Sequence, residues 1–537
     1  MKPPKTKSAH PPKPPAKAGE LYARAVSLHM EGKIEEALDQ IEKALAAGER
    51  APEVYAAAGY LKFERQQFEQ AAADYGKAVE GEPGNAVSCF NLAVSLQALG
   101  KWSDAAEMFE KALAIDANRF ESHLGLGLCR LHLGAARPAF EAYERCLRLF
   151  PALEPGKLEP VLFGKAVALQ LQKKFPEAAE LYRRILEQNP GNEEALANSV
   201  AVNLELKDYA AASSDAEHLL KVRPESGVAL EGLAAAAFAA EDYETAAAHC
   251  AALVKITPEA FEGWANLGAA SQKAGHPEAA RAYSEALRLR PDDAQLHINL
   301  GVTYQESGNL EKAKQSYQQA LDLSPDSATA LWNLALVLEQ DHALADAEKL
   351  YARMVEHSPD ALEARFRLGC IRLDLNDYRG AAEAFDACLW KRKDWPEALL
   401  NAGIAYWKLG ELDAAHDAFE RCLAAQPQSS EALRALAAIA IERGNIDEAV
   451  ELHTKVLESG ERSPEFLYNA ALLRQNSGSQ EEAVRLYREA LAASPDFAEA
   501  LLNLGIALDS LGQKEEARTS WQKALALKPE LASRYFQ

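Results

Sequence analysis

The chain has 537 residues, of which 48% are hydrophobic and 26% charged, a balance too apolar for a disordered polymer. Its 80 acidic against 58 basic residues give a formal net charge of −22. This argues against a general nucleic-acid binder, because such proteins present a basic surface. No run approaches the 18 apolar residues of a transmembrane helix, and the first residues lack the apolar region of a secretory signal, so we expect a cytoplasmic protein.

The N-terminal segment, residues 1–17, differs in composition from the rest of the chain. It carries six prolines and five lysines, which predict a disordered or extended polyproline II leader. A role in contacting a membrane surface or a partner protein is the alternative to a simple solvated leader.

A 34-residue period begins at Ala18 and continues to Leu531. Fifteen windows fit this span after two adjustments, a five-residue insertion at 154–158 and a one-residue deletion near Gly275. Window position 20 is alanine in every copy: Ala37, Ala71, Ala105, Ala139, Ala178, Ala212, Ala246, Ala279, Ala313, Ala347, Ala381, Ala415, Ala449, Ala483 and Ala517. A strict period of this length is the signature of a repeat array.

Each window predicts two helices. Apolar residues recur with helical spacing at positions 4, 7, 8 and 11 and again at 17, 20, 24 and 27. Glycine is frequent between the two runs, as at Gly100 and Gly308, and proline follows the second run, as at Pro83 and Pro325. Position 8 is nearly always Gly or Ala, which lets the two helices approach closely. Position 24 is a large aromatic in eleven copies, which we expect to fill the space between neighbouring repeats.

These residues resemble the tetratricopeptide repeat. The signature is clearest in one copy, where Trp264, Leu267, Gly268, Ala279, Tyr283 and Pro291 occupy its positions. The resemblance implies an all-α fold, an α-solenoid in which about fifteen helix-turn-helix repeats form a right-handed superhelix. It also implies that the first helix of each repeat lines a concave groove.

The repeat phase sets the domain boundaries. Repeats 1–4 occupy 18–153, repeats 5–15 occupy 159–531, and a short tail of 532–537 follows. The insertion 154–158 predicts either a kink between the two blocks or a longer loop. The last repeat lacks the polar cap that ends most arrays, so its second helix is expected to leave apolar surface for self-association or partner docking.

No pattern for catalysis or metal binding emerges from the sequence. There is no nucleophile elbow, P-loop, metalloprotease motif or dinucleotide fingerprint, and the twelve histidines lack metal-ligand spacing. The seven cysteines, Cys89, Cys129, Cys146, Cys250, Cys370, Cys388 and Cys422, are scattered and are expected to be free, buried thiols. The sequence therefore predicts a protein that is not an enzyme and has no cofactor or metal.

Asparagine recurs at window position 6, although it is a poor helix former. The eight copies are Asn91, Asn198, Asn266, Asn299, Asn333, Asn401, Asn469 and Asn503. One interpretation is that each amide bonds the backbone of a neighbouring repeat. The other is a ladder of amides that binds an extended peptide, and such ladders resemble the repeat half of O-linked N-acetylglucosamine transferases. The catalytic half of those enzymes has no counterpart in this chain.

Aromatic and acidic side chains are also expected in the groove. The candidate apolar anchors are Phe90, Trp332, Phe366 and Trp407, and position 2 is glutamate in nine copies. Position 9 is apolar throughout, so the carboxylate clamp of chaperone-tail adaptors is not expected. The predicted ligands are neutral to basic protein or peptide segments with apolar anchors. Alternatively, glutamate at position 2 simply stabilises the N-terminus of the first helix.

The sequence therefore predicts a non-catalytic protein–protein interaction scaffold that binds peptides in the groove of a superhelix. The alternative is a targeting or substrate-recruiting subunit of a glycosyltransferase complex. The segment 389–396, with three consecutive basic residues, is expected to be a solvated turn rather than a contact for an acidic partner.

Overall fold

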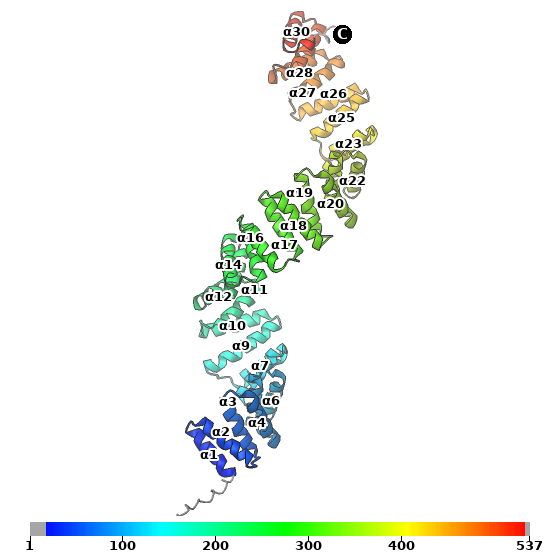
Figure 1. Ribbon diagram of the computed structural model, residues 1–537. Coiled ribbons are helices and arrows are strands. Elements are labelled where there is room, and N and C mark those ends of the chain that lie inside the picture. Colours follow the sequence, from blue (N-terminus) through cyan, green and yellow to red (C-terminus); the bar gives the residue numbers. More distant parts are fainter. Residues whose placement is uncertain (1–17, 532–537) are drawn as a thin grey trace, which may run out of the picture. The chain divides into compact units, whose positions relative to one another are not determined.

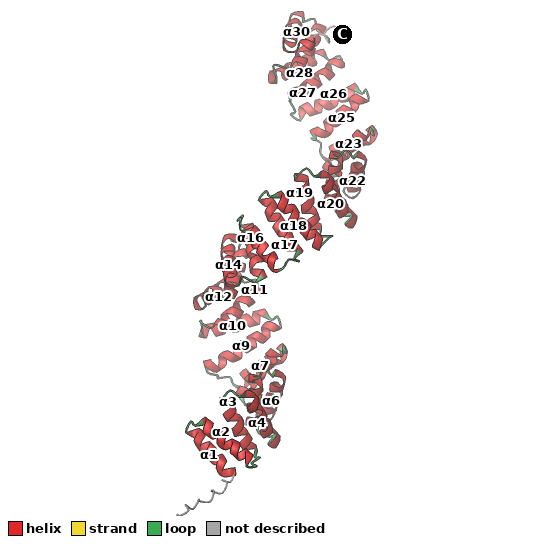
Figure 2. Cartoon of the chain, in the orientation of Figure 1, coloured by secondary structure: helices red, strands yellow, loops and turns green. Residues whose placement is uncertain are grey.

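The computed structural model describes residues 18–531, which are almost entirely helical (Figure 2). Thirty α-helices and one short 3-10 helix cover this range, with no strand among the described residues. The predicted all-α solenoid is confirmed, while the right-handed path of the superhelix stays a prediction. The predicted leader 1–17 and tail 532–537 lie outside the described residues.

The chain divides into two compact units that part between Leu289 and Arg290. The first unit holds repeats 1 to 8. Its helices are α1 (Ala18–Met30), α2 (Ile34–Ala46), α3 (Pro52–Glu64), α4 (Phe68–Gly81), α5 (Ala86–Ala98), α6 (Trp102–Ile115), α7 (Phe120–His132), α8 (Ala136–Leu149), α9 (Pro155–Leu171), α10 (Phe175–Gln188), α11 (Glu193–Glu205), α12 (Tyr209–Val222), α13 (Gly227–Ala239), α14 (Tyr243–Ile256), α15 (Phe261–Lys273) and α16 (Ala279–Leu289).

The second unit holds repeats 9 to 15. Its helices are α17 (Ala294–Glu306), α18 (Leu310–Leu323), α19 (Ala328–Gln340), α20 (Leu344–His357), α21 (Leu362–Asp374), α22 (Tyr378–Lys391), α23 (Pro396–Leu409), α24 (Leu412–Ala425), α25 (Ser430–Glu442), α26 (Ile446–Glu458), α27 (Pro464–Asn476), α28 (Gln480–Ala493), α29 (Ala498–Ser510) and α30 (Lys514–Leu527), followed by the 3-10 turn η1 (Pro529–Leu531).

Within each unit, consecutive helices pack side by side, as α9 and α10 do in Figure 1. The first helices of successive repeats also touch, for example α5 with α7 and α7 with α9. This second set of contacts aligns the first helices along one face of each unit. The groove described below lies on that face.

The turn inside each repeat requires a left-handed residue at position 15. All fifteen repeats have a positive φ there, and nine of them use glycine. The other six hold the same conformation with a side chain: Gln66, Lys173, Lys207, Glu241, His342 and Asn376. The predicted glycine break is therefore confirmed, and the turn forms even where its sequence signal is missing, because packing of both helices over-determines it.

The helix pairs are held together by the small residues and the aromatic rings. Every alanine at position 20 is buried. The glycines at position 8 lie directly against the aromatic ring at position 24 of their own repeat: a Cβ at Gly59 would lie 2.9 Å from Tyr75, and one at Gly127 would lie 2.6 Å from Tyr143 Cζ. The ring also reaches the next repeat, since Gly125 lies against Phe109. The ring thus fills both spaces, within the repeat and between repeats.

The two phase adjustments have clear structural outcomes. The inserted residues Pro155 to Leu158 are helical and form an extra first turn of α9, with Pro155 in the position where a missing N–H costs nothing. The prediction of a longer loop is therefore wrong. The deletion near Gly275 shortens α16 to 11 residues. The chain divides into its two units directly after this short helix, rather than at the insertion.

The end of the last repeat is partly covered. Leu531 in η1 is buried against Leu501, Leu502 and neighbouring residues, and the indole of Trp521 packs against the same cluster. The expected uncovered surface is therefore wrong for Trp521, while Leu527 is exposed. Self-association through this end stays a prediction.

All seven cysteines are free, and every one except Cys370 is buried. Burial raises the pKa of the thiols of Cys129, Cys146, Cys250, Cys370 and Cys388 to about 11. These thiols stay protonated near neutral pH and pack as small apolar side chains. Among the described residues, no helix is long and apolar enough to cross a membrane.

Candidate peptide-binding groove

A groove of about 760 Å³ lies in the first unit, along the first helices α5, α7, α9 and α11. Its walls are apolar and come from window positions 5, 9, 12 and 13. The wall residues are Phe90, Val94, Leu124, Leu128, Leu131, Phe163, Val167 and Leu171. Leu128 and Leu171 are exposed although they are large apolar side chains. An apolar hollow of this size with exposed leucines is typical of a binding site rather than of a solvated surface.

The floor of the groove is open because two consecutive repeats carry glycine at position 6. Gly125 lies over the ring of Phe109, and Gly164 lies over the ring and hydroxyl of Tyr143. A Cβ at either glycine would overlap the ring beneath it. Eight other repeats have asparagine at this position, so the absence of a side chain here leaves space in the groove above the two rings, which are themselves buried.

The hydroxyl of Tyr143 has no hydrogen-bond partner among the described residues, although its side chain is only 1% exposed. In five other repeats the tyrosine at position 24 donates to the residue at position 12: Tyr182 to Gln170, Tyr283 to Gln272, Tyr317 to Gln305, Tyr351 to Glu339 and Tyr487 to Gln475. Position 12 of repeat 4 is Leu131, which cannot accept. Burial raises the pKa of Tyr143, so its hydroxyl remains a donor that a ligand can use.

The edge of the groove is acidic. Glu121, Glu159 and Glu194 line it, and no Lys or Arg side chain does. The carboxylate of Glu159 accepts hydrogen bonds from Asn192 at 2.8 Å and from Asn189 at 3.3 Å, which fixes its position. A segment with apolar side chains flanked by Lys or Arg matches this combination of walls and edge.

The eight predicted asparagines do not behave as one ladder. Asn401 and Asn503 reach the preceding repeat, but they donate to Cys370 Sγ and to the Tyr468 hydroxyl. Asn198 donates to Glu194 of its own helix, and Asn299 accepts from Gln295. No hydrogen bond involves the amides of Asn91, Asn266, Asn333 and Asn469 in the described range, and Asn91 and Asn266 line two smaller hollows. The interpretation that each amide bonds a neighbouring backbone is therefore wrong, and peptide binding by them stays a prediction.

The predicted aromatic anchors are partly buried rather than fully presented. Phe90 lines the groove with its ring 5.9 Å from Phe109, and the Arg119 guanidinium lies 4.2 Å from the Phe90 ring. Trp332 packs edge-on against Tyr351 at 5.5 Å. Of the four predicted anchors, only Phe90 belongs to the large groove.

Phe366 and Trp407, the other two predicted anchors, lie in the second unit, as Trp332 does. Phe366 stacks on Trp395 at 4.8 Å, and the indole of Trp407 donates to Glu442 at 3.1 Å. Each side chain thus already has a contact within the fold. Trp332, Phe366 and Trp407 as peptide anchors stay predictions.

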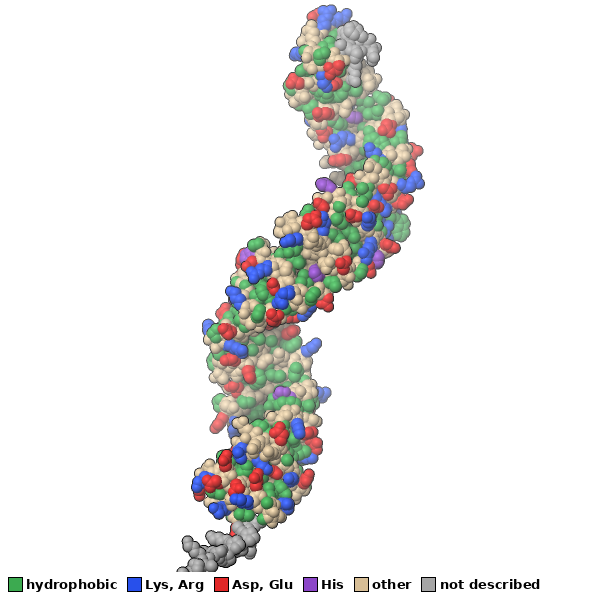
Figure 3. Space-filling model, viewed as in Figure 1, with side chains coloured by type: hydrophobic (Ala, Val, Ile, Leu, Met, Phe, Trp, Pro, Cys, Tyr) green, Lys and Arg blue, Asp and Glu red, His purple; other side chains and the backbone are tan. Residues whose placement is uncertain are grey.

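The basic segment 389–396 is occupied by local contacts. Lys391 forms an ion pair with Asp360 at 2.9 Å, and the Arg392 guanidinium lies 5.0 Å from the Trp395 ring. Trp390 projects into solvent and is 75% exposed. On the face seen in Figure 3, acidic and basic side chains are interspersed.

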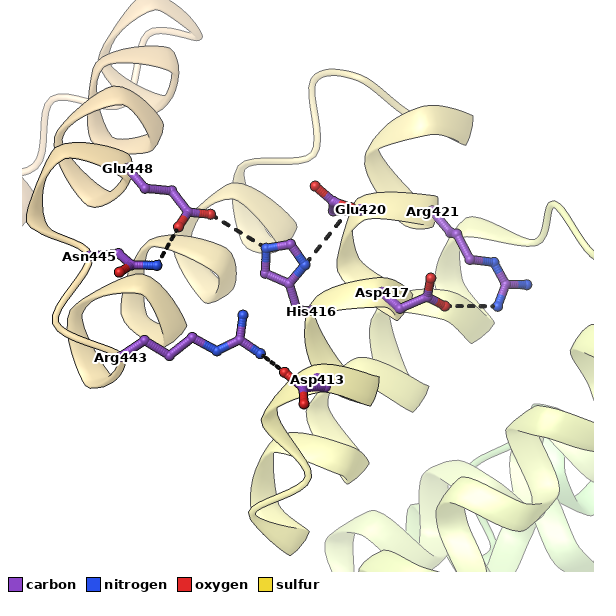
Figure 4. A network of polar contacts seen from close by, with 8 residues as sticks. All are labelled: Asp413, His416, Asp417, Glu420, Arg421, Arg443, Asn445 and Glu448. Carbon is purple, nitrogen blue, oxygen red and sulfur yellow. Dashed lines mark hydrogen bonds and ion pairs between the residues drawn. The ribbon is translucent and has the colours of Figure 1, made fainter.

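A polar network in the second unit joins repeats 12 and 13 (Figure 4). The guanidinium of Arg443 pairs with Asp413, and His416 lies between Glu420 and Glu448, with 3.4 Å from His416 Nε2 to Glu448 Oε1. These contacts link consecutive repeats. Within the described range no group of three His, Cys, Asp or Glu side chains could hold a metal ion.

Sequence reasoning missed the residues that open the groove. Gly125 and Gly164 were not singled out, and Tyr143 was considered only as one of the aromatic packing residues at position 24. The signal was nevertheless present: position 6 changes to glycine in two consecutive copies, and position 12 of repeat 4 changes to Leu131. A departure from the repeat pattern, rather than the pattern itself, marks the site.

The helix pairs, the left-handed turn and the buried alanines define an α-solenoid built from tetratricopeptide repeats. Models described as "Tetratricopeptide repeat" or "TPR repeat" match residues 62–126, 161–192, 203–261, 276–308, 299–361, 343–398, 366–415, 400–464 and 477–536. Together these matches cover well over half of the chain. The chain belongs to the tetratricopeptide-repeat family, whose repeats support a protein-interaction role.

Individual relatives match only parts of the chain. The Hsp70-Hsp90 organizing protein of Triticum aestivum is 33% identical over 98 residues, which are 18% of this chain and 17% of that protein. DnaJ homolog subfamily C member 7 of Homo sapiens is 29% identical over 100 residues, 19% of this chain and 20% of that protein. The matches thus span about a fifth of the length of these curated relatives.

Solved structures of low similarity include YrrB, titled a TPR protein with an unusual peptide-binding site. It is 21% identical, with a TM-score of 0.32, over 34% of this chain and 94% of that chain. The Naa15/Naa10 complex bound to HypK is 14% identical, with a TM-score of 0.32, over 95% of this chain and 94% of that chain.

Proposed function

We propose that this chain is a non-catalytic scaffold that binds segments of other proteins, and that the groove of α5, α7, α9 and α11 is a principal binding site. The observation that carries the proposal is the apolar groove, where Tyr143 lines the floor beneath Gly164 and its hydroxyl makes no hydrogen bond among the described residues. A hydroxyl at the floor of a groove can donate to an acceptor that a ligand supplies.

The chemistry of the preferred ligand follows from the groove. One or two apolar side chains would fill the space between Leu124, Leu128 and Phe163, and a backbone carbonyl would accept from Tyr143. Lys or Arg residues beside the apolar anchors would face Glu121 and Glu194. The expected partner is therefore a neutral to basic segment with apolar anchors.

A peptide-library selection on the full chain tests this proposal. We expect enrichment of peptides in which a large apolar residue is flanked by Lys or Arg. Leu128→Asp places a charge on the apolar wall and should weaken the selected peptides at least tenfold. The matched control is Leu133→Asp in the same repeat, because Leu133 is also exposed but lies outside the groove, and its affinity should stay within twofold. Equal binding by both variants would contradict the proposal.

The alternative role, a substrate-recruiting subunit of a glycosyltransferase complex, rested on the asparagine ladder. Because the amides make differing contacts, the structure adds no observation in its favour. We therefore keep the scaffold as the proposed function. The glycosyltransferase role would become the preferred one if a bound segment received a sugar only after a catalytic partner was added.

A further inference from the structure

A second hollow, of about 590 Å³, lies between the second helices α10 and α12, with α11 beneath them. In repeat 6 this hollow is lined by window positions 4, 7, 11 and 14, which are Leu196, Ser199, Asn203 and Leu206. The peptide groove is instead lined by position 2 of the same repeat, Glu194. Repeat 6 is unusual at these points: position 7, a leucine in most repeats, is Ser199, and position 11 is Asn203. The large aromatic at position 24 is also replaced by Ala216.

The floor of this hollow is a polar group centred on Asp215, which is partly buried and lies against two buried polar side chains. Ser199 Oγ donates to Asp215 Oδ2 at 2.6 Å, and Asn203 Nδ2 donates to the same oxygen at 3.1 Å. Ser199 is 3% and Asn203 is 7% exposed. The other oxygen, Oδ1, has no hydrogen bond within the described range, and burial raises the pKa of the carboxyl. Both hydrogen bonds to the carboxylate thus come from neutral donors, and His218 is the nearby basic group that favours its charged form.

Repeat 2 shows how the same fold position is satisfied by a charge. Position 23 is again aspartate there, Asp74, which is 5% exposed. The ammonium of Lys62, at position 11, pairs with Asp74 Oδ2 at 2.6 Å. Asn203 occupies position 11 in repeat 6, so the place that an ammonium fills in one repeat is a hollow in the other. Asp215 is only partly buried, but its carboxylate lies in a hollow where no cation pairs with it, so a cation that enters the hollow gains an ion pair.

The remaining charged groups around the hollow do not supply this cation. Arg183 is held by Glu180 at 2.7 Å and by Glu187, both on its own helix. Asp208 adds negative charge, and His218 lines the wall without forming an ion pair with Asp215. Acidic groups therefore outnumber basic ones around the opening.

We propose that this hollow binds a primary ammonium group on an alkyl stem, as carried by a lysine side chain of a partner protein. The ammonium would pair with Asp215 where Lys62 pairs with Asp74 in repeat 2, and the hollow is large enough for the stem. This site is independent of the peptide groove. A free diamine carries the same ammonium group on an alkyl stem and is the alternative ligand.

Methyl NMR on the full chain tests the proposal, with the methyl group of Ala211 in the wall of the hollow as the reporter. The probe is Nα-acetyl-lysine methylamide, and the neutral control is its Nε-acetylated form. We expect a saturable shift of Ala211 with the probe and none with the control. Cadaverine, tested alongside, identifies a free diamine as the source if it binds at least tenfold more tightly.

Three variants fix the interpretation. Asp215→Asn should abolish the shift, and Asn203→Lys should also abolish it, because it installs the ammonium of repeat 2 within the chain. Asp74→Asn is the matched control and should leave the probe affinity within twofold of the wild type. Unchanged alanine spectra elsewhere establish that the variants are folded. An unmoved Ala211, an equal shift with the acetylated control, or an equal shift in Asp215→Asn would overturn the proposal.

Discussion

Repeats 4 and 9 have the same core and differ in the polar surroundings of one hydroxyl. Tyr143 packs on Gly127 in repeat 4, and Tyr317 packs on Gly301 in repeat 9. The Tyr317 hydroxyl donates to Gln305 at 2.9 Å, whereas Tyr143 has no such partner. The shared packing therefore indicates only the fold, and the two repeats differ in whether position 12 accepts from the tyrosine hydroxyl.

The two repeats also differ in the residue that lies above the tyrosine ring. Position 6 of the following repeat is Gly164 after repeat 4 and Asn333 after repeat 9. Two departures from the repeat pattern thus coincide at one place, since one removes the hydroxyl's partner and the other leaves no side chain above the ring. Changes to these residues can separate the structural role of the tyrosine from its binding role.

The largest expected effect is common to both repeats. Tyr143→Ala and Tyr317→Ala each remove a buried ring and should destabilise their repeat by about 3–5 kcal/mol. Hydrogen exchange of the local helices is the suitable measurement, because repeat arrays open locally rather than as one unit. A loss below about 1 kcal/mol in either repeat would mean that the ring is not the core element described above.

Removing only the hydroxyl should separate the two repeats. Tyr317→Phe leaves the Gln305 amide without its donor and should cost about 1 kcal/mol by local hydrogen exchange. Tyr143→Phe should leave stability within about 0.5 kcal/mol and weaken a selected groove peptide roughly fivefold, equivalent to about 1 kcal/mol. Equal stability losses in both repeats would show that Tyr143 has a partner in the free protein.

Adding the missing acceptor should make repeat 4 resemble repeat 9. Leu131→Gln places at position 12 the residue that accepts from tyrosine elsewhere, so the groove peptide should bind a few-fold more weakly without loss of stability. Leu373→Gln is the matched control, because position 24 of that repeat is Phe385, which has no hydroxyl. Isothermal titration with one selected peptide measures both variants, and unchanged affinity for Leu131→Gln would exclude competition for Tyr143.

The smallest expected effect concerns repeat 13, where position 24 is His453 rather than Tyr, Phe or Trp. This ring stacks on Phe466 at 5.0 Å, and burial together with Arg474 lowers its pKa below the usual 6.5. A lowered folded pKa means that the stabilisation is complete above pH 6.5 and is lost as the pH falls through the folded value. Urea midpoints of wild type and His453→Phe should therefore diverge on acidification, and parallel pH profiles would exclude this role.

The sequence predicted most of the fold because its information is repeated. Fifteen copies of position 20 alanine identify the helix pairs even where a single copy is ambiguous, as at Lys207, which takes the left-handed turn without glycine. The expectation of a loop at the insertion was wrong, because Pro155 and Gly156 suggest a break in isolation, while a kink between the two blocks stays a prediction. In the folded chain Pro155 is the first residue of a helix, where the ring is compatible with helical geometry.

The candidate sites were predicted less well, and for a physical reason. The sequence singled out residues that recur, such as the asparagines, whereas the two hollows that we propose as binding sites lie where one repeat departs from the others. Asn401 and Asn503 show the difficulty, since identical positions contact a thiol in one repeat and a hydroxyl in the other. The partner of a side chain depends on the residue that the neighbouring repeat presents.

The sequence by itself determined the period, the two helices of each repeat and the buried faces, because these depend on residues close together in the chain. Only the tertiary structure decided which departures lie together. Gly164 and Leu131 belong to different repeats and become one site because both border the ring of Tyr143. Asp215 and Asn203 are joined in the same way across two helices. The period fixes which residues are buried, and packing between helices fixes which of them are left without a partner.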